Sequence, residues 1–241
     1  MKTLSFIAIA LFSGAIAGAM LGIVNQGVVE PFIDRAIDIE NQNAIAAGEL
    51  FNPNEYATYR IWQRGGEIAA GTVLGLSIGA LFGIVFAYAR DSLPGSSNKK
   101  KALVLAGVMW LVLFMVPALK YPANPPAVGD PETISYRQGI YLAFLAISGF
   151  GALGLAFLYR KLGAVRAKKA VIPAAYAAIM AVAFVAMPPN PDEITAPMDL
   201  VVSFRIASAF TISMFWGLLG ILLGSFWDRL KPHKAAKVNM H

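Results

Sequence analysis

Long apolar segments alternate along the chain with shorter stretches that are rich in charged, proline and asparagine residues. A bilayer core about 30 Å thick requires roughly 20 apolar residues in helical form. Charged side chains occur only at or near the ends of the apolar segments, as the cost of burying charge in a membrane requires. The pattern predicts an all-α integral membrane protein, one membrane domain over residues 1–241. Its six transmembrane helices are 3–24, 67–89, 102–119, 138–159, 170–187 and 200–227.

Basic residues are sorted between the two sides of these six spans. Fourteen Lys and Arg, against two acids, fall in residues 1–3, in the loops 90–101 and 160–169, and in the tail 228–241. The remaining segments and span edges hold six basic residues against twelve acids. Because cytoplasmic loops collect Lys and Arg, both termini are predicted to be cytoplasmic, in the cell membrane. The predicted outer segments are residues 25–66, 120–137 and 188–199.

The first span has an alternative interpretation as a signal peptide. Lys2 precedes an apolar run that contains the small residues Ala15, Ala17 and Ala19. The run continues without a polar break to Val24, which is longer than the apolar region of a usual signal peptide. We therefore expect the segment to be retained as a transmembrane helix.

Composition narrows the classes of function. Apolar residues make up 57% of the chain and charged residues 14%, cysteine is absent, and the two histidines are His233 and His241 in the tail. Thiolate chemistry is excluded, and the usual general base is missing from the spans. We expect no enzyme activity and no intrinsic cofactor. The net charge of +6 does not indicate nucleic-acid binding, because topology already accounts for the basic residues.

Glycines recur every four residues in the first two spans. They are Gly14, Gly18 and Gly22 in the first and Gly71, Gly75, Gly79 and Gly83 in the second. Such spacing places them on one face of each helix, and small faces let helix backbones approach closely. We expect a structural packing role, with a conduit lined by backbone as the alternative.

The outer segments share a pattern: an Asn/Pro-rich stretch, then a small hydroxyl residue, an aromatic residue and an arginine. The three arginines are Arg60, Arg137 and Arg205. The repetition predicts three tandem helical hairpins of the same orientation. We expect these arginines, with Arg64, to brace the outer ends of the helices. A ring of arginines that admits anions is the alternative.

The outer segments also hold oxygen ligands that suit divalent cations. The candidates for a metal entrance are Asn124, Asp130, Glu132, Asn190, Asp192 and Glu193, with Glu67 as a gate at the edge of the second span. Two alternatives stay open: solvated acids without a specific role, and a local pair of Glu67 with Arg64 three residues before it.

Two segments resemble the CbtA family of predicted cobalt transporter subunits. They are residues 117–134, PALKYPANPPAVGDPETI, and the last hairpin, which contains Asp192-Glu193, Phe204-Arg205 and the run FWGLLG at 215–220. The length and the six-span plan are also similar. The resemblance implies cobalt uptake for cobalamin synthesis, with a small single-span CbtB partner that carries histidine. In this chain, residues 25–64 contain no histidine, unlike the His-rich run of many family members.

These observations lead to two hypotheses. The first is a membrane subunit for metal uptake that works with the small partner and takes a transient divalent metal, cobalt by resemblance, as its cargo. The second is a structural or accessory subunit of a larger membrane complex that transports nothing itself. Under both hypotheses, the chain is embedded in the lipid bilayer and contacts its lipids.

Overall fold

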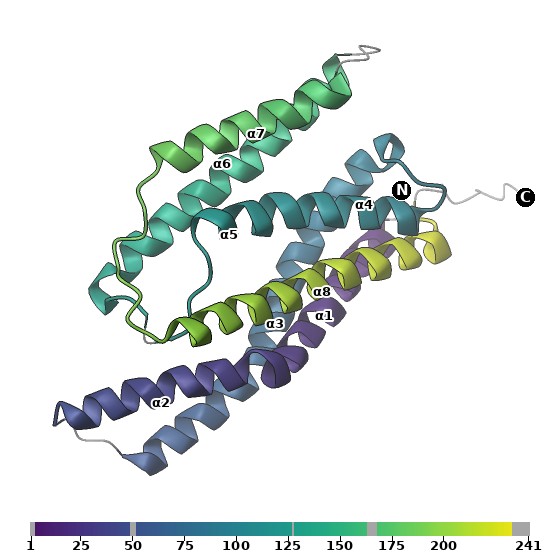
Figure 1. The fold of residues 1–241 in the computed structure, drawn as a ribbon. Coiled ribbons are helices and arrows are strands. Elements are labelled where there is room, and N and C mark those ends of the chain that lie inside the picture. Colours follow the sequence, from purple (N-terminus) through teal and green to yellow (C-terminus); the bar gives the residue numbers. More distant parts are fainter. Residues whose placement is uncertain (1–2, 49–51, 127, 163–167, 233–241) are drawn as a thin grey trace, which may run out of the picture. The chain divides into compact units, whose positions relative to one another are not determined.

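The computed structural model describes residues 3–48, 52–126, 128–162 and 168–232, and every regular element within these ranges is helical (Figure 1). The longer helices are α1 (Thr3–Val28), α2 (Glu30–Ala46), α3 (Pro53–Ala89), α4 (Asn98–Trp110), α6 (Ile134–Lys161), α7 (Lys168–Ala186) and α8 (Met198–Leu230). The short elements are η1 (Arg90–Ser92), the π-helical turn η2 (Leu111–Met115), α5 (Val116–Lys120) and the 3-10 turn η3 (Pro131–Thr133). Within the described residues, six helical stretches are long and apolar enough to cross a membrane. The prediction of an all-α, six-span membrane protein is confirmed, and the arrangement in three tandem hairpins stays a prediction.

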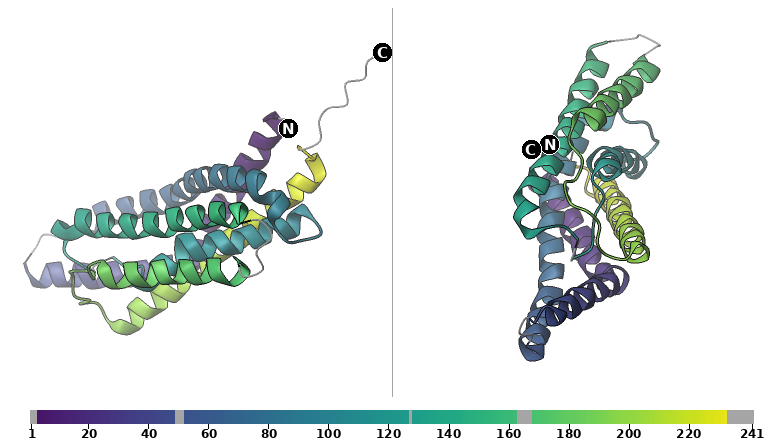
Figure 2. Two further views of the ribbon diagram at one scale, coloured as in Figure 1. Left: turned by 90° about the horizontal axis from the view of Figure 1, so that it is seen from above. Right: turned by 60° about the vertical axis from the view of Figure 1, so that its left-hand side comes forward.

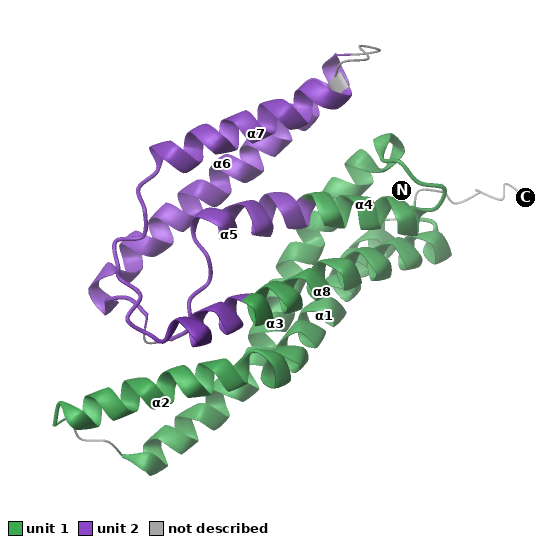
Figure 3. Cartoon of the chain, in the orientation of Figure 1, with its two compact units in different colours: residues 1–108, 206–241 green, residues 109–205 purple. Residues whose placement is uncertain are grey.

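The chain divides into two compact units (Figure 3). Unit 1 comprises residues 1–108 and 206–241, and unit 2 comprises residues 109–205. One boundary falls within α4 and the other within α8.

In unit 1, α1 and α3 pack against each other through their glycine faces. A methyl group on Gly75 would lie 2.7 Å from the Cα atom of Gly18, and one on Gly79 would lie 2.7 Å from the carbonyl oxygen of Ala10. Backbone therefore meets backbone, as small residues in membrane helices allow. This contact leaves no room for a conduit along these glycine faces.

The segment between the first two spans is largely helical. It forms α2 and the first turns of α3, which begins at Pro53, well before the predicted span at residue 67. Asn52 caps α3, because its side-chain oxygen accepts the N–H groups of Asn54 and Glu55. Proline at the first helical position and an acid in the first turn are favourable there. The Asn52-Pro53 pair, predicted as part of an outer segment, is thus the start of a helix.

The C-terminal part of α8 belongs to unit 1 and anchors the start of α4. The carboxylate of Asp228 accepts the backbone N–H groups of Asn98 and Lys99 at 3.3 and 3.2 Å, which satisfies donors at a helix N-terminus. Trp227 is buried beside this cap, with Phe86 packed edge-on against it at 5.0 Å between ring centroids. Residues far apart in the sequence therefore close this end of unit 1.

In unit 2, α6 and α7 lie side by side, as both views of Figure 2 show, with Phe144, Met180 and Ala183 buried between them. The π-helical turn η2 ends at Met115, two residues before Pro117. Proline has no N–H to donate four residues back, and a wider turn accommodates this loss. The hydroxyl of Ser148 donates to the carbonyl oxygen of Val112 at 2.5 Å. This bond joins α6 to the irregular part of the third span.

Candidate functional site

Arg137, near the start of α6, holds the two predicted outer segments of unit 2 together. Its Nε lies 2.9 Å from Oδ2 of Asp192, and its Nη2 donates to the carbonyl oxygen of Asp130 at 3.0 Å. The Asp192 carboxylate also accepts the hydroxyl of Thr133 at 2.7 Å and the N–H of Asp130 at 3.2 Å. Its side chain is 8% exposed. Asp192 is therefore neutralised by Arg137, and its Oδ2 is occupied by hydrogen bonds, so its first role is to fix the loops.

Gly129 makes this arrangement possible. Its φ of +94° lies in the left-handed region, which favours glycine. A methyl group there would also lie 2.7 Å from Nη1 of Arg137. The glycine therefore allows both the turn and the close approach of the guanidinium.

Arg205, at the unit 2 end of α8, forms a second brace. Its Nε donates to the carbonyl oxygen of Ala123 at 3.1 Å, and its Nη2 donates to Oδ1 of Asn124 at 2.7 Å. In the described part of the chain, Arg205 pairs with no carboxylate, and its Nη1 has no hydrogen-bond partner. Arg205 thus positions residues 123–124 and keeps an unneutralised positive charge.

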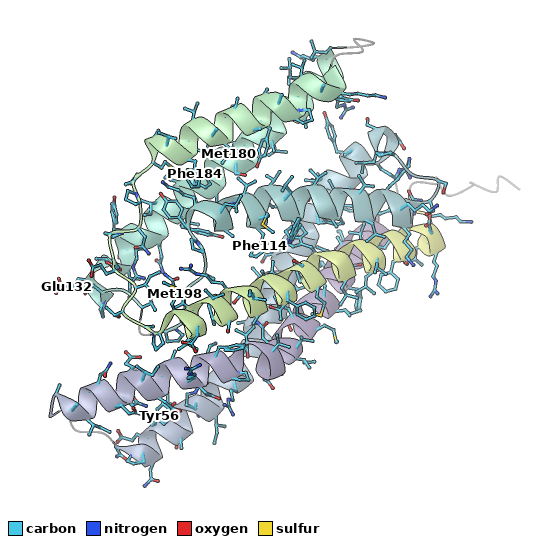
Figure 4. All side chains as sticks on the ribbon, viewed as in Figure 1. Tyr56, Phe114, Glu132, Met180, Phe184 and Met198 are labelled. Atoms are coloured by element: carbon cyan, nitrogen blue, oxygen red, sulfur yellow. The ribbon has the colours of Figure 1, made fainter. Side chains whose placement is uncertain are left out.

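Aromatic contacts fix the other side of these loops. The hydroxyl of Tyr121 donates to the carbonyl oxygen of Pro188 at 2.6 Å, and its ring meets Phe144 edge-on at 5.8 Å. Burial raises the pKa of Tyr121, which keeps the phenol a neutral donor. Lys120 donates to the carbonyl oxygen of Phe184 at 2.8 Å. Figure 4 labels Phe184 and Met180 on α7, so the Lys120 bond attaches the end of α5 to that helix.

A cavity of about 690 Å³ lies among these braces, entirely within unit 2. Its walls are largely apolar, with prolines of the 120–126 stretch and the rings of Phe114, Tyr121 and Tyr141. Its polar lining residues are Asn124, Arg137, Gln138, Asn190, Asp192 and Arg205. A concave, mostly apolar site with a few convergent polar groups is the usual form of a small-molecule site.

The predicted metal residues are therefore only partly brought together. Asn124, Asn190 and Asp192 line the cavity, whereas Asp130, Glu132 and Glu193 do not. Oδ1 of Asp130 instead accepts the N–H of Glu132 at 2.8 Å, and Figure 4 labels the exposed Glu132 in η3, where it leads into α6. Within the described residues, no group of three or more His, Asp and Glu side chains is arranged to hold a metal ion. The metal entrance stays a prediction.

Glu67 belongs to unit 1, whereas the other predicted metal residues belong to unit 2. Arg64 pairs with Asp34 at 2.5 Å and lies 3.6 Å from Glu30, so its partners are on α2. Glu67 lies beside the side chain of Asn25, and its Oε2 is buried without a hydrogen-bond partner among the described residues. A gating role for Glu67 stays a prediction.

Arg60 is the most enclosed arginine of the repeated pattern. It pairs with Glu30 and, at 2.6 Å, with Asp34, and the side chains of Arg60 and Glu30 are 9% and 8% exposed. Nη1 of Arg60 also donates to Oε1 of Gln63 at 2.6 Å. This network fastens α2 to α3 within unit 1.

Sequence reasoning missed Tyr141 and Phe114 as parts of the cavity. Tyr141 follows Arg137 by four residues, and this spacing places both on one helix face, so the repeated arginine pattern could have indicated it. Phe114 carried no such signal. It lies in the π-helical turn, whose side-chain directions do not follow from helical periodicity.

Comparison with known proteins places the chain in a family. Searches of curated proteins and of solved structures gave no match. A family model described as "Probable cobalt transporter subunit (CbtA)" matches residues 3–228. The match covers all six spans and both loops that form the cavity. The chain is therefore a multi-pass membrane protein that belongs to the CbtA family of transporter subunits.

Proposed function

We propose that the chain is the membrane subunit of a cobalt uptake system and admits its cargo at the cavity of unit 2. The family match carries this proposal, because it covers the spans and both cavity-forming loops. The cavity adds support, since it collects three of the predicted metal residues, Asn124, Asn190 and Asp192. Its loops are held by arginine and tyrosine contacts, which pre-organise a site before its ligand arrives.

The proposed orientation places the cavity outside and both termini in the cytoplasm. The distribution of Lys and Arg supports it. Cargo would then meet the loops 120–137 and 188–199 before it reaches the membrane core.

The proposed partner is a small single-span subunit that bears histidine. Its imidazoles would supply the nitrogen ligands that this chain lacks outside its tail, where His233 and His241 fall beyond the described residues. A transporter described as having subunits also requires at least one further chain. The central parts of the spans carry no Asp, Glu, His or Lys, so energy coupling would have to come from the partner or from the ion gradient.

Accumulation of radioactive cobalt in cells tests the proposal. Cells that express the chain with the small partner should accumulate more cobalt than cells that lack either one. A cobalt level that does not change on deletion of this chain would reject transport. Copurification with a larger complex would then favour the accessory function instead.

A further inference from the structure

The net charge of the cavity lining determines whether the cavity favours a hydrated metal cation or a metal bound to an anionic ligand. Three charged residues line it: Arg137, Asp192 and Arg205. Arg137 and Asp192 neutralise each other at 2.9 Å. Arg205 contacts a carbonyl and an amide oxygen, and the described residues offer it no carboxylate. The lining therefore has a net positive charge, which repels a hydrated dication and attracts an anion.

The donor atoms of the cavity lead to the same conclusion. Asn124 uses Oδ1 to accept from Arg205, and Asn190 uses Oδ1 to accept the N–H of Asp192. The side-chain oxygens left for direct binding are mainly Oδ1 of Asp192 and the amide oxygen of Gln138, which are fewer than the six ligands that a hard cation takes. In contrast, Nη1 of Arg205 is a donor without a partner among the described residues, and the guanidinium geometry suits a carboxylate.

The size and the walls of the cavity also fit a ligand larger than a hydrated ion. A cation with six waters fills roughly 180 Å³, since each water takes about 30 Å³. The cavity holds about 690 Å³. Its proline and aromatic walls, including Phe114 and Tyr141, suit the carbon skeleton of an organic molecule.

We propose that this cavity binds the metal as a complex with a small organic carboxylate, with Arg205 contacting a carboxylate oxygen of that ligand. This inference rests on the proposed function and specifies the form of its cargo. The metal stays bound to its chelator in the cavity, so Asn124 and Asn190 need not replace a complete coordination shell.

Binding to the purified full chain in lipid nanodiscs tests the inference. The three probes are cobalt chloride in a non-coordinating buffer, citrate alone, and a one-to-one cobalt–citrate complex, measured by equilibrium dialysis with radioactive cobalt and radioactive citrate. The complex should bind at least about tenfold more tightly than either component. Equal binding of hydrated cobalt, or of citrate alone, would overturn the inference.

Two variants assign the binding to the cavity. Arg205→Gln removes the unneutralised charge and should weaken the complex about tenfold. Gln138→Glu adds a negative charge to the lining without removing a bracing contact, so it should weaken the complex and strengthen binding of hydrated cobalt. Lys161→Gln makes the same change of net charge on an exposed residue of unit 2 outside the cavity and should change neither.

The outcomes for the two proposals can be separated. If Arg205→Gln does not fold, Gln138→Glu decides, and unchanged binding in that variant rejects the inference. Chain-dependent cobalt uptake combined with equal binding of both metal forms would reject the inference and leave the proposed function standing. Tight binding of the complex without chain-dependent uptake would reject transport and keep the cavity as a site for metal chelates.

Discussion

Unit 1 and unit 2 use the same sequence pattern in opposite ways. In unit 1, Arg60 meets two carboxylates, Glu30 and Asp34, and glycine faces bring α1 and α3 into backbone contact. In unit 2, Arg137 meets the one carboxylate of Asp192, and Arg205 is paired with no carboxylate in the described part of the chain. The guanidinium of Arg60 is therefore neutralised in unit 1, whereas in unit 2 Arg205 lines a cavity and has no paired carboxylate among the described residues. The comparison agrees with the proposal that unit 2 holds the recognition site.

The largest loss of stability is expected from a change in the buried ion pair between Arg60 and Glu30 in unit 1. Arg60→Met leaves the buried Glu30 without its closest partner and should destabilise the protein by about 3 to 5 kcal/mol. Thermal unfolding of the detergent-solubilised protein measures the loss. Arg64→Gln is the matched control, because Arg64 is 49% exposed and should cost at most about 1 kcal/mol. If the two variants lose the same stability, the buried Arg60 network contributes no more than the exposed Arg64 pair, and the prediction is wrong.

The glycine contact in unit 1 should be nearly as sensitive. Gly75→Val forces a branched side chain against the backbone of α1 and should cost about 3 kcal/mol or prevent folding. The yield of monodisperse protein and its unfolding temperature report the effect. Gly107→Val is the control, because no atom lies within 4 Å of a methyl group on Gly107. A stable Gly75→Val variant would show that α1 and α3 do not meet along this face.

A smaller loss of stability is expected from a change in the ion pair between Arg137 and Asp192 in unit 2. Arg137→Gln leaves Asp192 with two hydrogen bonds but no counter-charge, which should cost about 2 kcal/mol. The double variant Arg137→Gln with Asp192→Asn removes the unpaired charge and should recover part of the stability. A double variant no more stable than the single one would indicate that Asp192 is not neutralised by Arg137.

The smallest effect concerns the hydroxyl bond at the π-helical turn. Ser148→Ala removes the donor to the Val112 carbonyl and the partner of the Tyr176 hydroxyl at 2.7 Å, and each lost bond should cost about 0.6 kcal/mol, the average for such bonds in membranes. Ser77→Ala, at an exposed position of α3, is the control. Faster amide exchange near Val112 in the Ser148 variant alone would tie the bond to the turn. An unchanged exchange rate would contradict that link.

Much of the architecture followed from the order of apolar and polar residues. Six spans were predictable because a helix must cover a hydrocarbon thickness without charge, and the predicted limits agree closely with α4 to α5, α6, α7 and α8. The helical form of residues 30–46 was not predicted, because this segment is polar overall and was interpreted only as an outer segment, although Ile33, Ala36 and Ile37 recur at helical spacing. The Asn-Pro pair at residues 52–53 was visible in the sequence, but such a pair occurs both in turns and at helix starts. The sequence alone therefore did not identify Asn52 as a helix cap.

The sequence by itself determined the class of the protein, the six spans and the positions of the glycine faces, because these depend on local composition and helical periodicity. It also singled out Asn124, Asn190, Asp192, Arg137 and Arg205, although not their partners. Only the tertiary structure paired Arg205 with Asn124, 81 residues away, and placed the Asp192 carboxylate against the N–H of Asp130, 62 residues away. Whether a charged side chain is neutralised or left for a ligand depends on which distant segments fold beside it. No local pattern specifies those neighbours.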